Sequence, residues 1–237
     1  MNSAPIKAAK NRAFSFVEQQ QAALDDGQIT EAEWFAIHNA FFTGHYLAAD
    51  NPRDQSGHNG DEARYRYSRM IILEAIHKNG TFLDVGCANG YLVESLERWL
   101  TGSGLQVSFW GLDISAGLVE LAKQRLPAWE ERFLLGNALY WTSSMRYDFV
   151  YLCGLELVPV GRQRELIARL LDLFVAEDGR LILGPITEER SLQTLEEQLG
   201  AWGYSPTGYC EKSHQDFTEL ARKLFWFDKP SGTPCHD

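Results

Sequence analysis

A glycine-containing turn is the feature of this sequence best suited to chemistry: residues 82–91 read FLDVGCANGY. The apolar run predicts a strand that ends near Asp84, and the apolar spacing after Tyr91 predicts a helix. Gly86 can adopt backbone angles that a Cβ would forbid, and Gly90 lets a ligand approach the backbone where the helix begins. The segment therefore predicts a nucleotide-type binding site where a parallel strand leads into a helix.

Two common nucleotide motifs do not match this turn. The dinucleotide fingerprint G-x-G-x-x-G places glycines where this chain has Ala88 and Tyr91. A phosphate-binding P-loop continues with Gly-Lys-Ser or Gly-Lys-Thr, and no such run follows here. Asp84 would also repel a pyrophosphate, whereas a carboxylate can hold a cationic amino group. A nicotinamide-dependent oxidoreductase is therefore the less favoured alternative.

The run DVGCANG, an acidic residue followed by G-x-G/A-x-G, resembles the first motif of class I S-adenosylmethionine-dependent methyltransferases. The resemblance implies S-adenosyl-L-methionine as the cofactor and S-adenosyl-L-homocysteine as the product. It implies transfer of a methyl group to an acceptor, with Asp84 helping to hold the amino end of the methionine moiety. The turn would then supply much of the cofactor site: Asp84, Gly86, Cys87, Ala88, Asn89 and Gly90.

A second apolar run, QVSFWGLDIS over residues 106–115, contains another acid of functional interest. In a doubly wound fold, an acid at the end of the second strand accepts hydrogen bonds from ribose hydroxyls. We expect Asp113 to have this role, with Ile114 beside it in the cofactor site. The alternative is that Asp113 only caps the helix that begins near Ser115.

Two further runs follow in the order of the family's motifs. FLLGNA over 133–138 predicts a third strand. The resemblance implies that Asn137 binds the adenine amino group and that Ala138 offers its backbone N–H, although Asn137 could instead be only a turn residue. YDFVYLCGLELVP over 147–159 predicts a fourth strand. The resemblance implies that Leu152 and the residues after it face the cofactor and the transferred methyl group.

The candidate catalytic residues follow from the chemistry of a sulfonium methyl group. Its transfer is an in-line displacement that depends on positioning and on excluding water. A general base is needed only when the acceptor enters protonated, as a phenol or alcohol does. The candidate bases are Glu156, which burial would have to strengthen, and His45 in an expected lid. Tyr46 is a candidate for the acceptor pocket. The alternatives are a turn cap, an exposed loop histidine and a packing tyrosine.

Some acceptors do not fit the sequence. Family members that methylate base or amide nitrogens carry an Asn/Asp-Pro-Pro-aromatic motif after the fourth strand, where this chain reads LCGL at 152–155. The metal-assisted catechol subgroup uses clustered carboxylates, and Asp148 stands alone, so we expect no metal. A small organic molecule methylated on oxygen, nitrogen or carbon remains as the acceptor. A non-catalytic S-adenosylmethionine-binding protein is a further alternative.

Composition limits the partners and the compartment. The chain of 237 residues has a net charge of -10, from 22 basic and 32 acidic residues, which disfavours nucleic acid and anionic membranes as partners. It has no apolar run near the roughly 20 residues of a membrane span, and its first residues lack the apolar core of a secretory signal. The four cysteines are scattered without metal-type spacing. We therefore expect a cytoplasmic protein; nothing indicates its oligomeric state.

The order of these patterns predicts the fold class. Strand and helix alternate from residue 81 to 186, which indicates an α/β fold with a doubly wound, mostly parallel sheet. The resemblance implies seven strands, with an antiparallel C-terminal hairpin at 207–213 and 222–228 on the sheet edge. A helix is expected over 188–203, and the tail from 230 to 237 is expected to fray.

Extra helices are predicted before the glycine turn. Apolar spacing predicts one over 7–24, and Thr30 and Glu33 have the capping-box spacing of a second, which Gly44 would end. Asp61 would cap a third. The polar stretch between Gly44 and Asp61 is long enough to be a lid. The resemblance implies that residues 1–79 cover the active site and that residues 80–237 form the S-adenosylmethionine-binding domain. The alternative is that these helices only cover an edge of the sheet.

Overall fold

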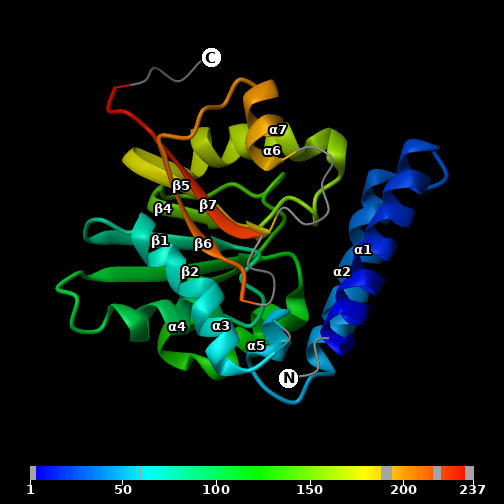
Figure 1. Ribbon diagram of the computed structural model, residues 1–237, viewed down its shortest axis with the longest axis horizontal. Helices are drawn as coiled ribbons and strands as arrows, with labels where there is room; N and C mark the ends of the chain where they lie inside the picture. The colour runs from blue at the N-terminus through cyan, green and yellow to red at the C-terminus, as the bar shows by residue number, and fades with distance from the viewer. Residues whose placement is uncertain (1–3, 59, 188–193, 216–219, 233–237) are drawn as a thin grey trace.

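A seven-stranded sheet organises the protein. The computed structural model describes residues 4–58, 60–187, 194–215 and 220–232 (Figure 1). The strand order is β3-β2-β1-β4-β5-β7-β6. The strands are β1 (Gly80–Val85), β2 (Val107–Asp113), β3 (Phe133–Leu135), β4 (Tyr147–Leu152), β5 (Val175–Thr187), β6 (Gly208–Ser213) and β7 (Ala221–Asp228). Strands β1 to β5 pair in parallel, whereas β7 is antiparallel to both β5 and β6. The expected sheet and its C-terminal hairpin are confirmed.

Helices cover both faces of the sheet, and two more stand at its side (Figure 1). Helices α3, α4 and α5 lie on one face, and α6 and α7 lie on the other. The helices are α1 (Ala4–Asp25), α2 (Glu31–Leu47), α3 (Glu62–Arg69), α4 (Tyr91–Leu100), α5 (Ala116–Arg125), α6 (Gln163–Arg169) and α7 (Leu195–Ala201). Short helical turns extend α3 over Met70–Ala75 and α6 over Leu170–Phe174. The expected helix over 188–203 is seen only as α7, because residues 188–193 and the tail from 233 lie outside the described residues.

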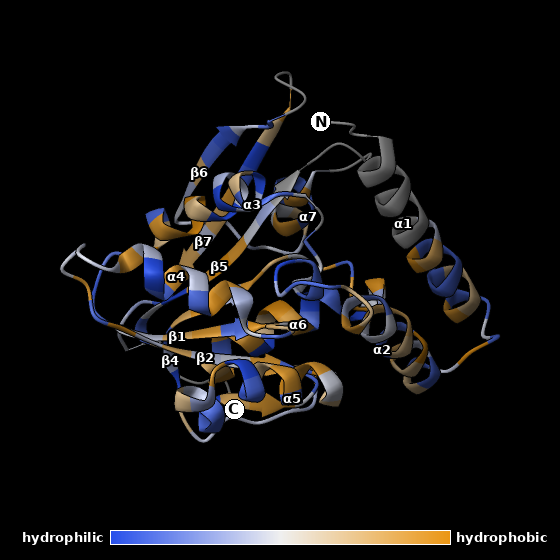
Figure 2. Ribbon diagram, turned by 90° about the horizontal axis from the view of Figure 1, so that it is seen from below, coloured by the Kyte–Doolittle hydropathy of each residue, from blue (hydrophilic) through white to orange (hydrophobic). Residues whose placement is uncertain are grey.

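Alternating side chains of the strands build two cores, one on each face. Hydrophobic residues colour much of the ribbon of the central strand β1 (Figure 2). Phe82 of β1 belongs to the cluster under α4, while the next residue, Leu83, belongs to the cluster under α6. Phe149 and Val150 of β4 divide in the same way. All four side chains are fully buried. Strands buried on both faces read as continuous apolar runs, which explains why the central strands were recognisable in the sequence.

The order of the strands creates a crevice between β1 and β4. The chain passes from β1 outward to β2 and β3, then returns to place β4 on the other side of β1. In open α/β sheets, ligands bind at the carboxyl ends of the strands where the order reverses in this way. The residues after Val85, Asp113 and Leu152 therefore meet at one edge of the sheet.

The N-terminal helices begin where the capping patterns indicate, but one does not end as expected. Thr30 accepts a hydrogen bond from the Glu33 backbone, and the Glu33 carboxylate accepts one from Thr30 in return. Asp61 caps α3 through the Arg64 backbone. Helix α2 continues through Gly44 to Leu47, so Gly44 does not end it. An interior glycine costs about 1 kcal/mol of helix stability, a penalty that contacts along α2 can outweigh.

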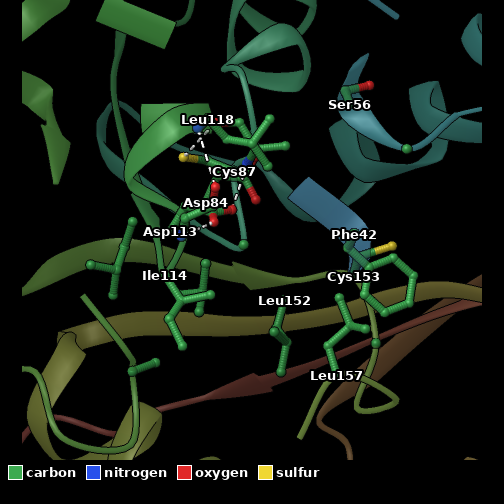
Figure 3. A pocket seen from close by; sticks show the side chains of 18 of the residues that line it. Phe42, Ser56, Asp84, Cys87, Asp113, Ile114, Leu118, Leu152, Cys153 and Leu157 are labelled. Atoms are coloured by element: carbon green, nitrogen blue, oxygen red, sulfur yellow. Dashed lines mark hydrogen bonds between the residues drawn. The ribbon is translucent and has the colours of Figure 1, made fainter. Parts of the chain in front are cut away.

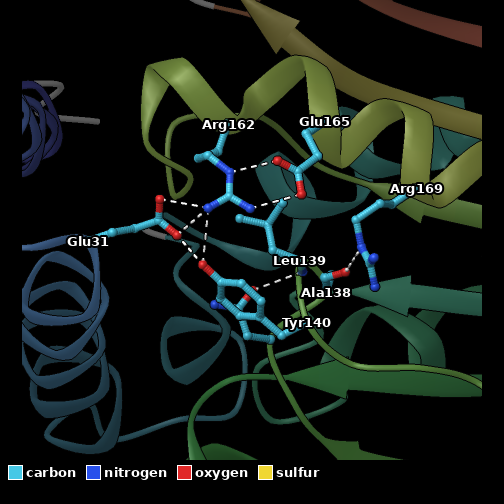
Figure 4. Close-up of polar contacts among 8 residues, drawn as sticks. Glu31, Ala138, Leu139, Tyr140, Arg162, Glu165 and Arg169 are labelled. Atoms are coloured by element: carbon cyan, nitrogen blue, oxygen red, sulfur yellow. Dashed lines mark hydrogen bonds and ion pairs between the residues drawn. The ribbon is translucent and has the colours of Figure 1, made fainter.

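Two anchors hold α2 against the sheet domain. At its first turn, the Glu31 carboxylate lies 2.5 and 2.7 Å from Arg162 Nη1, and it also contacts the Tyr140 hydroxyl (Figure 4). Glu165 holds the other nitrogens of Arg162 at 2.7 and 2.8 Å. Further along α2, the Thr43 hydroxyl lies 2.7 Å from that of Ser115. The inner face of α2 is thereby fixed across the carboxyl ends of the strands.

Candidate active site

A cavity of about 340 Å³ lies at the carboxyl ends of β1, β2 and β4. Its floor comes from the glycine turn and from the segments that follow β2, β3 and β4 (Figure 3). The inner face of α2, the end of α3 and residues 56–58 of the loop after α2 form the other walls. The volume is in the range of pockets that hold small organic ligands, roughly 300–1,000 Å³.

The glycine turn has the backbone conformation that its sequence indicates. Gly86 has a φ of +83°, and its N–H donates to the Leu112 carbonyl of β2 at 2.7 Å. Gly90, at φ +75°, begins α4, but a Cβ there would lie 2.8 Å from the Phe133 ring. Close packing against Phe133 therefore explains this glycine. Gly90 is not among the residues that line the cavity, and the approach of a ligand to it stays a prediction.

Asn89 also lies outside the cavity wall and has a structural role. Its side chain is fully buried. The amide donates to the Pro52 carbonyl at 2.8 Å, and Oδ1 accepts a hydrogen bond from the Tyr91 backbone. Arg125 donates to the Asn89 carbonyl at 2.6 Å. Asn89 thereby ties the loop after α2 to the start of α4, while Gly86, Cys87 and Ala88 line the cavity.

Asp84 is a buried acid whose carboxylate is only partly satisfied, although Arg69 lies near it. It lines the cavity and is 2% exposed, and its Oδ2 has no hydrogen-bond partner within the described residues. Burial, with a smaller contribution from nearby Asp113, raises the pKa of Asp84 to about 7, although Arg69 acts in the opposite direction. An unpaired buried carboxylate is costly. The site therefore favours a ligand that brings a cationic or hydrogen-bond-donating group to Asp84.

Asp113 is fixed by two backbone groups at the end of β2. Oδ2 accepts a hydrogen bond from the Ala88 N–H at 2.8 Å, and Oδ1 accepts one from the Ser115 N–H at 2.8 Å (Figure 3). Burial raises its pKa, and these N–H groups act in the opposite direction. Helix α5 is capped by Ser115 itself, through the Leu118 N–H. Asp113 thus joins the glycine turn to β2, and its remaining lone pairs can accept further donors.

The other predicted cofactor residues also line the cavity. Ile114, which is 38% exposed, lines the cavity, as does Leu152 at the end of β4. Asn137 both lines the cavity and stabilises a turn, because its Oδ1 accepts a hydrogen bond from the Leu139 backbone at 3.0 Å. The two roles that the sequence left open for Asn137 therefore coexist. Ala138 follows it in the same wall.

The structure separates the candidate catalytic residues. Glu156 lines the cavity but is exposed, so the burial that would strengthen it as a base is missing. His45 is exposed and stacks on Phe41 with ring centres 4.8 Å apart, outside the cavity wall. Tyr46 lines the cavity, and burial, with a smaller contribution from Asp113, raises its pKa to about 12. Of the three, only Tyr46 is both enclosed and in the wall.

Three polar side chains of the wall were not anticipated. His38 and His58 line the cavity, and each has a buried Nε2 without a hydrogen-bond partner within the described part of the chain. Arg69, at the end of α3, also lines the cavity, and no hydrogen bond or ion pair engages its guanidinium among the described residues. Apolar spacing along α2 places His38 on the buried face. No local sequence signal distinguishes Arg69 or His58.

Comparison with known proteins identifies the central segment. Residues 82–176 match a family model described as a methyltransferase domain. This segment is a methyltransferase domain. The resemblance found in DVGCANG is thereby confirmed. The match runs from β1 into β5 and contains the glycine turn, Asp113 and Asn137. It does not include α1, α2 or α3, so much of the cavity's outer wall lies beyond the matched methyltransferase domain. No curated protein sequence matches the chain.

Solved structures share the fold of the methyltransferase domain. One is 1,6-didemethyltoxoflavin-N1-methyltransferase from Burkholderia thailandensis, bound to 1,6-didemethyltoxoflavin and S-adenosylhomocysteine. It is 16% identical, with 86% of this chain and 92% of that chain covered and a TM-score of 0.58. Magnesium protoporphyrin IX methyltransferase from Synechocystis PCC 6803, with bound S-adenosylmethionine, is 16% identical, with 81% and 96% covered and a TM-score of 0.52.

A third structure aligns with a larger share of this chain but with a smaller share of its own chain than the two above. Phosphoethanolamine N-methyltransferase 1 from Haemonchus contortus, in complex with phosphoethanolamine and S-adenosylhomocysteine, is 13% identical with a TM-score of 0.57. The alignment covers 90% of this chain and 53% of that one. At these identities the likeness shows a common fold and leaves the acceptor open.

The described residues form neither a candidate membrane span nor a candidate metal-binding cluster. None of the helices they form is both long enough and apolar enough to span a membrane. No group of three or more His, Cys, Asp or Glu side chains among them is placed to hold a metal ion.

Proposed function

We propose that this protein transfers a methyl group from S-adenosyl-L-methionine to a small-molecule acceptor. The observation that carries the proposal is the unpaired Asp84 carboxylate at the glycine turn of the methyltransferase domain, with Arg69 lining the same cavity. The methionine end of the cofactor carries an ammonium and a carboxylate. Asp84 would hold the ammonium and Arg69 the carboxylate, so both charges would gain partners.

The remaining cofactor contacts follow from the same floor. Asp113, already fixed by two backbone N–H groups, would accept hydrogen bonds from the ribose hydroxyls. Ile114 would pack against the adenine, while Asn137 and Ala138 would meet its polar edge. Leu152 at the end of β4 would face the methyl end. These proposed roles follow from where each residue lies in the wall of the cavity.

The acceptor would enter from the α2 side of the cavity. Phe35, Phe42 and Tyr46 of α2 supply an apolar and aromatic wall there. The cavity volume suits a small molecule, and the three solved methyltransferases above act on small molecules by name. We therefore propose that residues 1–79 shape the acceptor pocket and residues 80–237 bind the cofactor. Unpaired Cys87, Cys153 and Cys210 fit a reducing compartment such as the cytoplasm.

Catalysis would rest mainly on positioning. The cofactor, when bound, supplies a methyl group that the sulfonium already activates. The floor holds one reactant, and the aromatic wall of α2 holds the other in line with it. Residues 56–58 of the loop and Tyr46, which line the cavity, would exclude water from it once the ligands are bound. The chain's own residues would therefore bind and orient the two reactants and exclude water from them.

The direct test is methyl transfer from labelled S-adenosyl-L-methionine to a metabolite extract. The wild-type protein should place label on a small molecule and release S-adenosyl-L-homocysteine. The Asp113→Ala variant should lose most of this activity at limiting cofactor, which controls for contaminating enzymes. Tight binding of the cofactor without transfer to any component would instead favour the non-catalytic alternative.

The loop after α2 should be protected by the cofactor. It contacts the domain through Asn89 and Pro52, and its Gly57 packs against the Tyr46 hydroxyl. Between residues 48 and 59 the only site for trypsin is Arg53. We expect cleavage after Arg53 to be at least several-fold slower with S-adenosyl-L-homocysteine, because lids close over occupied sites. The Arg53→Gln variant identifies the fragment, and equal cleavage in both states would make the loop a static cover.

A further inference from the structure

A histidine on the inner face of α2 stands where the acceptor would bind. Phe35, His38 and Phe42 recur at helical spacing, and all three line the cavity. The ion pair of Glu31 with Arg162 and the hydroxyl contact of Thr43 fix the helix on either side of His38. His38 therefore holds a fixed place between two aromatic side chains in the wall of the cavity.

Contacts of its ring define which nitrogen of His38 carries the proton. Nδ1 lies 2.8 Å from the Trp34 carbonyl oxygen, one helical turn earlier. A carbonyl oxygen only accepts, so Nδ1 carries the hydrogen, and Nε2 has a free lone pair in the neutral ring. Nε2 is buried and has no hydrogen-bond partner among the residues that the structure describes. His38 thus has a single, unsatisfied hydrogen-bond acceptor on a side chain that lines the cavity.

Aromatic neighbours hold the ring in this orientation. The Trp34 ring stacks on His38 at a centroid distance of 3.5 Å, and Phe16 packs against it at 5.2 Å. Burial lowers the pKa of His38, and the Trp34 carbonyl acts in the opposite direction. Burial therefore favours the neutral imidazole, whose Nε2 lone pair can take up a proton. The ring geometry, the burial and the unpaired lone pair of Nε2 all fit a role for His38 as a proton acceptor.

We propose that His38 is a catalytic base that binds and deprotonates the acceptor, and that the acceptor is an aromatic compound methylated on a phenolic hydroxyl. The proposal rests on the proposed function. The aromatic wall of Phe35 and Phe42 accommodates a flat ring, and the lone pair of Nε2 requires a donor such as a hydroxyl. A phenol has a pKa of about 10, so a neutral imidazole is a useful base for it.

The step balances without any further reactant. As the phenolic oxygen forms its bond to the methyl carbon, the bond from that carbon to sulfur breaks, and its electron pair stays on sulfur. The phenolic proton passes to His38 Nε2 and then to solvent. The products are an aryl methyl ether, S-adenosyl-L-homocysteine and one proton.

The experiment compares two acceptors that differ in acidity. Wild type, His38→Gln and His45→Gln would be assayed with labelled cofactor on 2-naphthol, which is neutral near pH 8, and on 4-nitrophenol, which is largely ionised there. For 2-naphthol, His38→Gln should lower kcat by roughly 10²–10⁴-fold, the usual contribution of a general base. For 4-nitrophenol the loss should stay below about tenfold, because no proton has to be removed. KM should change little.

His45→Gln is the matched control, because His45 lies on the same helix but outside the cavity wall, and its activity should equal that of wild type. Calorimetry with S-adenosyl-L-homocysteine checks that His38→Gln still folds and binds. Equal losses on both phenols would make His38 a positioning residue and overturn the proposal. Binding of the ligand by wild type with methylation of neither phenol would overturn the acceptor class alone. Failure to bind it would overturn the proposed function.

Discussion

Replacing Asp84 with asparagine is expected to raise the free energy of unfolding of the empty protein above pH 7, by at most roughly 4–5 kcal/mol. The pKa of the buried carboxyl is raised from 3.8 to about 7, and each unit corresponds to about 1.4 kcal/mol. Between about pH 4 and pH 7, the Asp84 carboxyl keeps its proton in the folded state but has lost it in the unfolded state. Stability from this group is therefore present below pH 4 and is lost as the pH rises towards 7. Asparagine removes that loss.

The difference between wild type and variant should accordingly be small near pH 4 and largest above pH 7, as measured by urea unfolding. Asp148→Asn is the matched control, because Asp148 accepts hydrogen bonds from Thr81 and pairs with Lys78, which lowers its pKa despite partial burial. That variant should be slightly less stable at pH 7. A destabilised Asp84→Asn protein would contradict the view that its carboxylate is unpaired.

The Asp84→Asn variant should bind S-adenosyl-L-homocysteine at least tenfold more weakly than the wild-type protein at pH 8. The ligand's ammonium favours the ionised carboxylate, so the wild-type protein should release a proton on binding below pH 7. Its affinity should then fall by up to about tenfold for each pH unit below 7, while the affinity of Asp84→Asn should depend less on pH. A stabilised apo protein with weaker ligand binding would mark Asp84 as a residue kept for function.

Replacing Asp113 with alanine should cost roughly 2–4 kcal/mol of cofactor affinity, because hydrogen bonds to a charged group are worth about 1.5–3 kcal/mol each and are not additive. The sequence alone predicts that the fold survives this change, since the residue ends a strand. The structure adds a cost, because Ala88 and Ser115 would each lose a backbone hydrogen bond to the carboxylate. We expect a lower melting temperature together with the loss of affinity.

Thr194→Ala separates the two effects of Asp113→Ala. Thr194 caps α7 through the Glu197 backbone, on the face of the sheet opposite α5, and its loss should cost about 1 kcal/mol of stability. Affinity for S-adenosyl-L-homocysteine should not change in that variant. If Asp113→Ala kept wild-type affinity at a lower melting temperature, its carboxylate would be a structural link only.

The floor of the cavity could be predicted from the sequence because local rules govern it. Strands buried on both faces leave continuous apolar runs, so the ends of β1, β2 and β4 were visible, and with them Asp84, Asp113 and Leu152. The glycine turn followed from residue types alone. The caps at Thr30 and Asp61 were readable because a capping contact spans only three residues.

The outer wall could not be predicted because long-range contacts decide it. Thr43 contacts Ser115, 72 residues away, and Glu31 reaches Arg162 over 131 residues. These anchors place His38 in the cavity wall and leave His45, seven residues further along the same helix, exposed. Gly44 was predicted to end α2, but the helix continues through it because its packing outweighs the cost of an interior glycine.

The roles of Gly90 and Asn89 were also hidden from local sequence. Both belong to the motif, yet packing against Phe133 explains the first, and the Pro52 carbonyl holds the second. A motif therefore identifies the turn without saying which of its residues face the ligand.

Calorimetric titration of the wild-type protein with S-adenosyl-L-homocysteine and, separately, with NAD tests the central claim most directly. The unpaired Asp84 and the Ala88 turn predict a dissociation constant in the micromolar range for the first ligand and no useful binding of the second. Tighter binding of NAD, or no binding of S-adenosyl-L-homocysteine, would contradict the assignment of the cavity to a methyl-donor site.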